Sequence, residues 1–151
     1  SSVEGGAVLQ PSGTAETSGR MPENSPTEIY QKAFSDYASG RFQRAVSGFE
    51  AFVRLYPTND YVANALYWLG ESYVNLQEPA LALDAYGRIA DRYPDWGKTP
   101  EVLLKSASIL FQMNRLGEAR TLVGILQENY PKSNAAKRSM EDARFYSESQ
   151  P

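Results

Sequence analysis

The centre of the chain carries two runs of apolar residues spaced three or four positions apart, the period of an amphipathic helix. The first run contains Leu69 and the small residue Gly70, and the second contains Tyr86 and the small residue Ala82. Small residues on facing surfaces let two helix backbones approach closely while larger side chains fill the space around the contact. The pattern therefore predicts a pair of helices, packed against each other, over residues 59–94.

The same pattern occurs three times along the chain. Three prolines that each follow a tyrosine stand at positions 57, 94 and 131, so the step is 94 − 57 = 131 − 94 = 37 residues. A helix pair this short cannot bury both of its apolar faces alone, and like neighbours are expected on each side. We therefore predict an all-α stack of three helix hairpins over about residues 26–57, 59–94 and 98–131. Side chains of similar size keep the step: Ile29, Leu66 and Leu103; Ala33, Gly70 and Ala107; Ala45, Ala82 and Ala119; Phe49, Tyr86 and Val123; Phe52, Ile89 and Leu126.

Local signals predict where the first helices begin and end. Ser25 and Glu28, with a proline between them, form a capping box that starts the first helix. This helix should run to about Ser39 and stop at Gly40. The second helix should follow over residues 42–56, where the first Tyr-Pro pair ends it.

A terminal helix is predicted after the third hairpin, over residues 134–147. Met140 occupies the position that Leu66 and Leu103 occupy in the second and third repeats. No partner helix follows it, and its many charged residues suit a cap with a wet outer face.

The first 25 residues differ in composition from the rest. They are rich in Gly, Ser, Thr, Pro and Glu, and their few apolar residues have no helical or strand spacing. Too little surface can be buried here to offset the entropy of ordering the chain, so residues 1–25 are predicted to be a flexible linker. A recognition peptide is the alternative.

Charge and composition narrow the classes of function. Fifteen basic and 18 acidic residues give a net charge of −3, which gives no electrostatic reason to expect nucleic acid, and no apolar run is long enough for direct membrane insertion. Cysteine and histidine are absent, so the commonest nucleophiles, bases and transition-metal ligands are missing. The carboxylates Glu71, Asp84 and Asp91 have no spacing that pairs them in a pocket. We expect no enzyme activity, no metal and no cofactor; the alternative, a hydrolase on a helical scaffold, would show perturbed carboxylates in a pocket.

The repeated pattern resembles the tetratricopeptide repeat (TPR): a large residue, Leu-Gly, an aromatic, then Ala, an aromatic and Pro at fixed offsets. The middle copy matches best, while Asp36 and Leu110 stand at the aromatic position in the other two. The resemblance implies a right-handed superhelix of three hairpins plus a capping helix. The step of 37 residues exceeds the usual repeat of about 34, so the curvature of the superhelix stays open.

The resemblance also implies a binding groove, because the first helices of TPR hairpins line a concave face. Aromatic residues beside a few amides suit a peptide or helix laid in such a groove. The alternative is that some of these residues, foremost Tyr37 and Phe111, pack onto the neighbouring repeat, whereas Trp68 and Tyr73 are expected in the core. Lys105 is the single basic residue at the positions where other TPR domains hold carboxylates, so a clamp of that type is not expected. The predicted partner-binding residues are Tyr30, Phe34, Tyr37, Asn64, Tyr67, Glu71, Val74, Leu104, Ser108 and Phe111.

Several segments narrow the resemblance to one family, and they span most of residues 26–146. These segments are Tyr67-Trp-Leu-Gly-Glu-Ser-Tyr73, the Arg-Tyr-Pro that ends at Pro94, Lys98-Thr-Pro-Glu-Val-Leu-Leu-Lys105, Gly117-Glu-Ala119 and Tyr130-Pro-Lys-Ser-Asn-Ala-Ala136. They are similar to the C-terminal domain of the Tol–Pal-associated periplasmic proteins of the YbgF/CpoB family. The resemblance implies a periplasmic location, an upstream signal peptide and an upstream coiled coil.

That family implies a non-enzymatic scaffold that binds TolA and coordinates outer-membrane constriction with peptidoglycan synthesis in cell division. The repeat domain has no exposed heptad seam, so we expect it to be a monomer, and any oligomer of the full-length protein would form through the upstream coiled coil. The competing function is a TPR lipoprotein of an outer-membrane protein-assembly machine. A lipidated N-terminal cysteine in the full gene product would favour that alternative.

Overall fold

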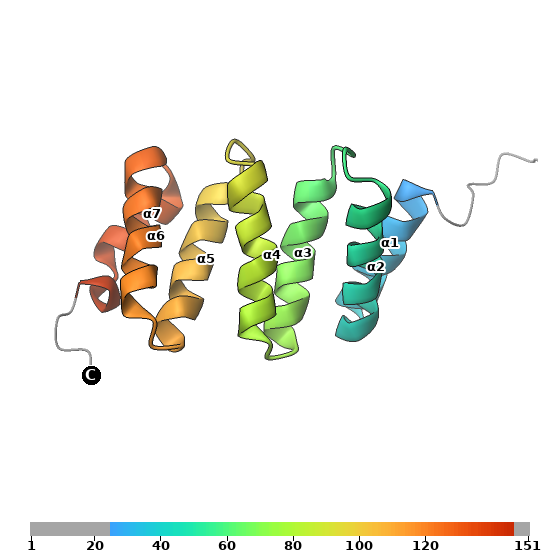
Figure 1. Cartoon of the computed structure of the whole chain (residues 1–151), viewed down its shortest axis with the longest axis horizontal. Coiled ribbons are helices and arrows are strands. Elements are labelled where there is room, and N and C mark those ends of the chain that lie inside the picture. The colour runs from blue at the N-terminus through green and yellow to red at the C-terminus, as the bar shows by residue number, and fades with distance from the viewer. Residues whose placement is uncertain (1–24, 147–151) are drawn as a thin grey trace, which may run out of the picture.

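The computed structural model describes residues 25–146, which form seven α-helices and one short 3-10 helix and contain no strand. The helices follow one another as three antiparallel hairpins and a shorter terminal helix (Figure 1). Their bounds are α1 Pro26–Ala38, α2 Phe42–Leu55, α3 Val62–Asn75, α4 Pro79–Arg92, α5 Thr99–Gln112, α6 Leu116–Asn129, α7 Asn134–Glu141 and η1 Ala143–Phe145. The predicted all-α stack of three hairpins with a terminal helix is confirmed.

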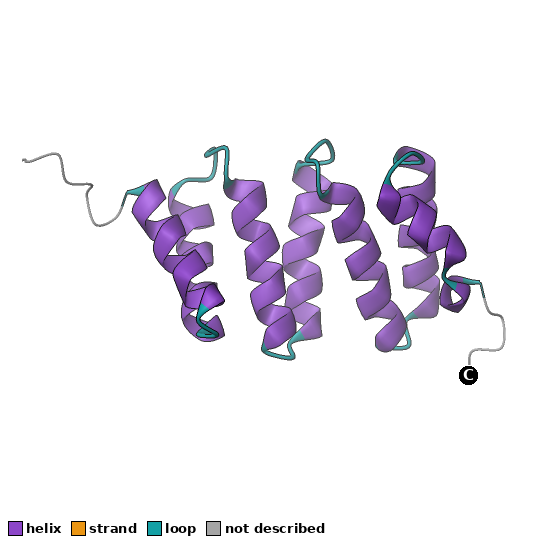
Figure 2. Ribbon diagram, turned by 180° about the vertical axis from the view of Figure 1, so that it is seen from behind, coloured by secondary structure: helices purple, strands orange, loops and turns teal. Residues whose placement is uncertain are grey.

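The hairpins stand side by side and form two layers. The first helices, α1, α3, α5 and α7, make one layer, and α2, α4 and α6 make the other (Figures 1 and 2). Helices α3 and α5 each pack against their own partner and against the second helix of the preceding hairpin, and α7 packs against α5 and α6. The exposed surface of the first layer is called the groove face below.

Small residues hold the hairpins together where the repeat pattern predicts them. Ala45, Ala82 and Ala119 are each buried at 1% exposure or less. In the second hairpin, a Cβ at Gly70 would lie 2.3 Å from Cε1 of the buried Tyr86 ring. The absence of a side chain at position 70 is therefore what lets the Tyr86 ring cross α3.

The first hairpin solves the same packing problem with the small residue on the other helix. Ala33 stands at the position of Gly70, and Gly48 on α2 faces it, so that a Cβ at Gly48 would lie 2.7 Å from the Cβ of Ala33. Close helix approach therefore survives the change from glycine to alanine because the facing helix supplies the glycine.

The turns within the hairpins share one backbone conformation. Gly40, Gln77 and Asn114 all have positive φ, of 79°, 59° and 63°. In each turn the next residue donates its N–H to a carbonyl of the preceding helix, as in the bond of 2.9 Å from Glu78 to Tyr73. This arrangement satisfies the last carbonyls of the first helices and sets the reversal of the chain. At the start of α1, Ser25 Oγ accepts a hydrogen bond of 3.2 Å from the N–H of Glu28, as the capping box predicts.

In the first hairpin Asp36 stands where the repeat pattern has an aromatic residue, and it forms ion pairs there. Its buried carboxylate accepts from Arg41 Nε at 3.0 Å and from Lys32 Nζ at 3.3 Å. Burial alone would raise the pKa of Asp36, but these two cations outweigh burial and lower it. Asp36 is thus held ionised within the first hairpin.

The terminal helix is shorter than the predicted span of 134–147. It ends at Glu141, Asp142 is extended, and a 3-10 turn follows in which Phe145 is buried. Met140 is 55% exposed, although Leu66 and Leu103 at the same repeat position are buried; among the described residues only a 3-10 turn, and no second helix, follows α7. Residues 1–24, which are most of the predicted linker, lie outside the described residues.

Candidate functional site

Three aromatic side chains meet on the groove face where the first and second hairpins join. The ring centroids of Phe34 and Tyr37, both on α1, lie 5.1 and 5.0 Å from that of Trp68 on α3. Phe34 remains 39% exposed, and Tyr37 and Trp68 are half-buried. Burial raises the pKa of the Tyr37 hydroxyl, so this group stays neutral. We call Phe34, Tyr37 and Trp68 the aromatic cluster.

The tyrosines that precede this cluster on α1 and α3 face inward more than predicted. Tyr30 makes edge-to-face contacts with Phe49, Phe52 and Tyr61 at 5.5 to 5.6 Å. Tyr67 is only 9% exposed and belongs to the core. Burial raises the pKa of both hydroxyls. A cavity of about 500 Å³ lies beside Tyr30, between the start of α1 and the loop before α3.

Glu71 takes part in an internal network in place of a free groove contact. Its carboxylate accepts a hydrogen bond from the Tyr86 hydroxyl and forms an ion pair of 3.2 Å with Lys105 Nζ on α5. Burial and the neighbouring carboxylate raise the pKa of Tyr86. Burial alone would lower the pKa of Lys105, but Glu71, Tyr67 and Glu101 together outweigh burial and raise it. The network ties the second hairpin to the third.

The remaining predicted residues of the second and third repeats have different surroundings. Asn64 is half-buried on α3. Val74 is 43% exposed and borders an apolar cavity of about 400 Å³ shared with Ile109 and Met113. Leu104 packs towards the terminal helix.

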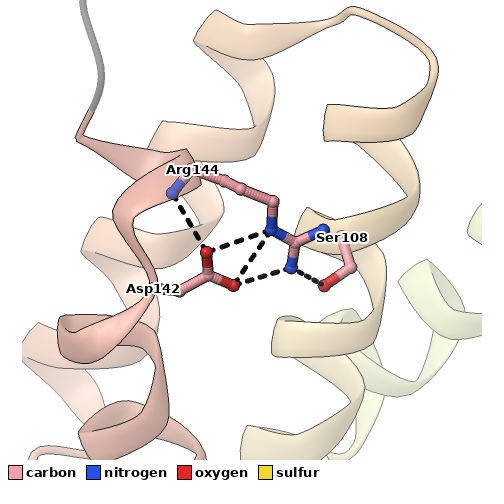
Figure 3. A network of polar contacts seen from close by, with 3 residues as sticks. All are labelled: Ser108, Asp142 and Arg144. Atoms are coloured by element: carbon pink, nitrogen blue, oxygen red, sulfur yellow. Dashed lines mark hydrogen bonds and ion pairs between the residues drawn. The ribbon is translucent and has the colours of Figure 1, made fainter.

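The C-terminal turn covers the third-repeat part of the groove face. Figure 3 shows Arg144 reaching from this turn to Ser108 on α5, a contact of 3.5 Å, with the Asp142 carboxylate beside its guanidinium. The same guanidinium lies 5.2 Å from the centroid of the Phe111 ring, which makes an edge contact with Phe145. Hydrogen bonds from Arg144 lower the pKa of Asp142. Ser108 and Phe111 therefore contact the C-terminal turn of the chain itself.

Three residues of the groove face lie outside the positions predicted to bind a partner. Trp68 was assigned to the core, yet it forms one side of the aromatic cluster. Lys98 and Lys132 lie in the loops before α5 and α7 and line a cavity with Tyr67 and Lys105. The repeat register could have indicated Lys98, because Lys98 takes the position that Tyr61 takes one repeat earlier.

Among the described residues, neither a group of metal ligands nor a carboxylate with a raised pKa is found. Between Ser25 and Tyr146 there is no group of three or more acidic residues placed to hold a metal ion. The two carboxylates with shifted pKa values, Asp36 and Asp142, are both lowered, which is opposite to the shift a general acid needs. Across this same part of the chain no helix has the length and apolarity needed to span a membrane.

These features define a class of protein: a stack of helix hairpins whose first helices present side chains to a partner. The family model of the tetratricopeptide repeat matches residues 29–59, 64–95 and 101–133, and the chain belongs to this family. Members of the family are interaction scaffolds without catalytic activity, and this chain is such a scaffold.

One stretch also resembles a curated protein. It is 47% identical over 47 residues to the cell division coordinator CpoB of Pseudomonas putida, a match that covers 31% of this chain and 17% of that protein. The chain therefore matches only a small part of that relative.

Solved structures share the fold at low sequence identity. The Yersinia enterocolitica type III secretion chaperone SycD, in complex with a peptide of the translocator YopD, has a TM-score of 0.64 and 22% identity, covering 80% of this chain and 88% of SycD. PcrH from Pseudomonas aeruginosa has a TM-score of 0.64 and 19% identity, covering 84% and 93%.

Proposed function

We propose that this chain is the TPR domain of a scaffold in the bacterial Tol–Pal envelope system. In the periplasm it binds TolA and coordinates outer-membrane constriction with peptidoglycan synthesis during cell division. The match to a cell division coordinator and the motifs of the YbgF/CpoB type support this cellular role. Membership of the TPR family supports its mode of action, the binding of a partner segment.

The aromatic cluster is the observation that carries the proposal. Three large rings gather on one face, and Phe34 is more exposed than a ring that serves packing alone. Aromatic anchors of this kind supply much of the binding energy in protein interfaces. An apolar side chain of the partner would bind against Phe34 and Trp68.

The covered third repeat limits where such a segment lies. Because the C-terminal turn contacts Ser108 and Phe111, the open part of the groove face spans α1, α3 and the first half of α5. A partner segment that crosses these helices contacts the aromatic cluster first and the loop before α5 next.

Calorimetric titration of the protein with the periplasmic region of TolA tests the proposal. Phe34→Ala should weaken binding by about 1–2 kcal/mol, or roughly 5- to 30-fold, because the main exposed anchor is lost. Leu55→Ala is the matched control, since Leu55 is 50% exposed but lies on α2, in the other layer. Wild-type protein that fails to bind TolA would refute the assignment, and equal losses in both variants would refute the groove face as the site.

A further inference from the structure

The cavity lined by Lys98 and Lys132 opens on the groove face between the second hairpin, the third hairpin and the terminal helix. It has a volume of about 620 Å³, and its walls come from α3, from the loops before α5 and α7, and from the first turns of those two helices. The side chains that matter for its chemistry are Tyr67, Lys98, Glu101, Lys105, Lys132 and Asn134. A space of this size admits several atoms of a ligand at once.

The charges around this cavity are unbalanced. Lys98, Lys105 and Lys132 line it, and Glu101 is the one acidic residue among the lining side chains of this cavity. Glu101 is itself held by Arg138, and Lys105 is held by Glu71. With these two neighbours counted, four cations stand against two carboxylates. A local excess of positive charge on a chain whose net charge is −3 marks a site for an anion.

Two of the lysines lack an acidic partner. Within residues 25–146, Lys98 and Lys132 form no ion pair; Lys98 Nζ lies instead 5.0 Å from the centroid of the Tyr67 ring. Both lysines are exposed and stand in loops, so their amines can turn towards a ligand. The N-termini of α5 and α7 also border the cavity and favour negative charge.

The cavity is continuous with the aromatic cluster through one side chain. The ring of Tyr67 contacts both the Trp68 ring, at 5.2 Å between centroids, and the Lys98 amine. A ligand that binds both features therefore has an apolar part and an acidic part. A peptide meets this requirement, whereas a small free anion does not.

We propose that this cavity binds the acidic residues of a peptide whose apolar residues bind the aromatic cluster. The inference rests on the proposed function, in that the groove face binds a partner segment, and it adds the chemistry of that segment. Aspartate or glutamate side chains of the peptide pair with Lys98 and Lys132, the two amines without an acidic partner, and steer the peptide into the groove.

Two synthetic peptides test the charge requirement by fluorescence anisotropy. One carries leucines followed by a block of glutamates, and its twin has glutamine in place of every glutamate. The acidic peptide should bind about tenfold more tightly at low salt, and sodium chloride should close the gap. Equal binding of the two peptides to the wild-type protein would overturn the inference.

Variants locate the effect. Lys98→Gln with Lys132→Gln should remove the preference for the acidic peptide, while Arg54→Gln with Arg92→Gln, which removes as much charge from the other layer, should keep it. A preference that survives the lysine substitutions would overturn the inference. Inorganic phosphate that displaces the peptide well below the ionic strength at which sodium chloride does so would assign the cavity to phosphate and overturn the choice of a peptide.

The TolA titration separates this inference from the proposed function. If Phe34→Ala weakens TolA binding but the two lysine substitutions do not, the acidic segment is refuted while the TolA scaffold stands. If TolA does not bind but the acidic peptide does, the assignment of TolA is refuted while the cavity keeps its ligand class.

Discussion

The junction of the first and second repeats and the junction of the second and third use matching positions with different chemistry. Phe34 and Trp68 meet at the first junction as two rings 5.1 Å apart. One repeat later the same two positions hold Glu71 and Lys105, which form an ion pair of 3.2 Å. The backbone arrangement repeats, and the interaction that crosses it changes from aromatic to ionic.

A second pair of positions shows the same change. Tyr61 makes an edge-to-face contact with Tyr30 at the first junction, at 5.6 Å. At the second junction the equivalent contact is Lys98 over Tyr67, at 5.0 Å. The small residues stay buried in every repeat, while the side chains at the rim of each junction change from aromatic to charged.

The largest expected effect comes from exchanging the junction residues for alanine. Trp68→Ala should lower the free energy of unfolding by about 2–4 kcal/mol, because a large ring with aromatic neighbours is lost. Lys105→Ala, at the equivalent position, should cost at most about 1 kcal/mol, because its ion pair is partly exposed.

Urea unfolding followed by circular dichroism measures both values. Only the cost of Lys105→Ala should shrink as salt is added, since salt screens charges and leaves ring packing unchanged. Equal costs for the two variants would contradict the difference between the junctions.

The close packing of helices around small residues should be weakened by a substitution at Gly70. Gly70→Ala should destabilise the protein by about 1–3 kcal/mol, because the new Cβ would collide with the Tyr86 ring. Gly87→Ala is the control on α4: no atom lies within 4 Å of its added Cβ, so the higher helix propensity of alanine should give about 0.5–1 kcal/mol of added stability. Thermal melts of the two variants should therefore shift in opposite directions.

The first and second hairpins should also differ in how their stability depends on pH. Asp36 forms ion pairs in the first hairpin, whereas Tyr73 occupies the same repeat position in the second. The folded-state pKa of Asp36 is lowered, so its stabilising effect is complete above the pKa of the unfolded chain and is lost as the pH falls through the folded-state value. Asp36→Asn should cost about 1 kcal/mol at neutral pH and progressively less in acid. A cost for Asp36→Asn that stays constant from neutral pH into acid would contradict the ion pairs with Arg41 and Lys32.

The smallest expected effect lies in the turns. Gln77 has a positive φ that Gly40 adopts without strain in the first repeat. Gln77→Gly should therefore raise the free energy of unfolding by up to about 1 kcal/mol. Gln31→Gly, at an exposed position inside α1, should lower it by a similar amount, and chemical denaturation distinguishes the two signs.

The repeat period predicted the fold because side chains of similar size recur at matching positions in all three copies, so each copy supports the same structure for the others. Ala45, Ala82 and Ala119 are all buried, as three matching small residues required. The repeat register placed Met140 with Leu66 and Leu103, which are buried, but Met140 is exposed, and among the described residues only a 3-10 turn follows α7. The burial of Phe145 has no counterpart in the repeats that could have signalled it.

The candidate site was predicted less well than the fold for a physical reason. The predicted groove positions all lie on helices and therefore did not include Lys98 and Lys132, which stand in loops. Tyr67 was expected to be an open anchor, but Lys98 and Trp68 cover its ring. Which face of an aromatic ring stays open depends on contacts across repeats, and helical spacing does not encode them.

The central claim is that a partner binds on the groove face. Mapping of amide shift changes by nuclear magnetic resonance tests this claim most directly. The isotope-labelled protein is titrated with the periplasmic region of TolA. The account predicts shift changes along α1, α3 and the first half of α5, including Phe34, Trp68 and Lys98. Shift changes confined to α2, α4 and α6 would contradict it.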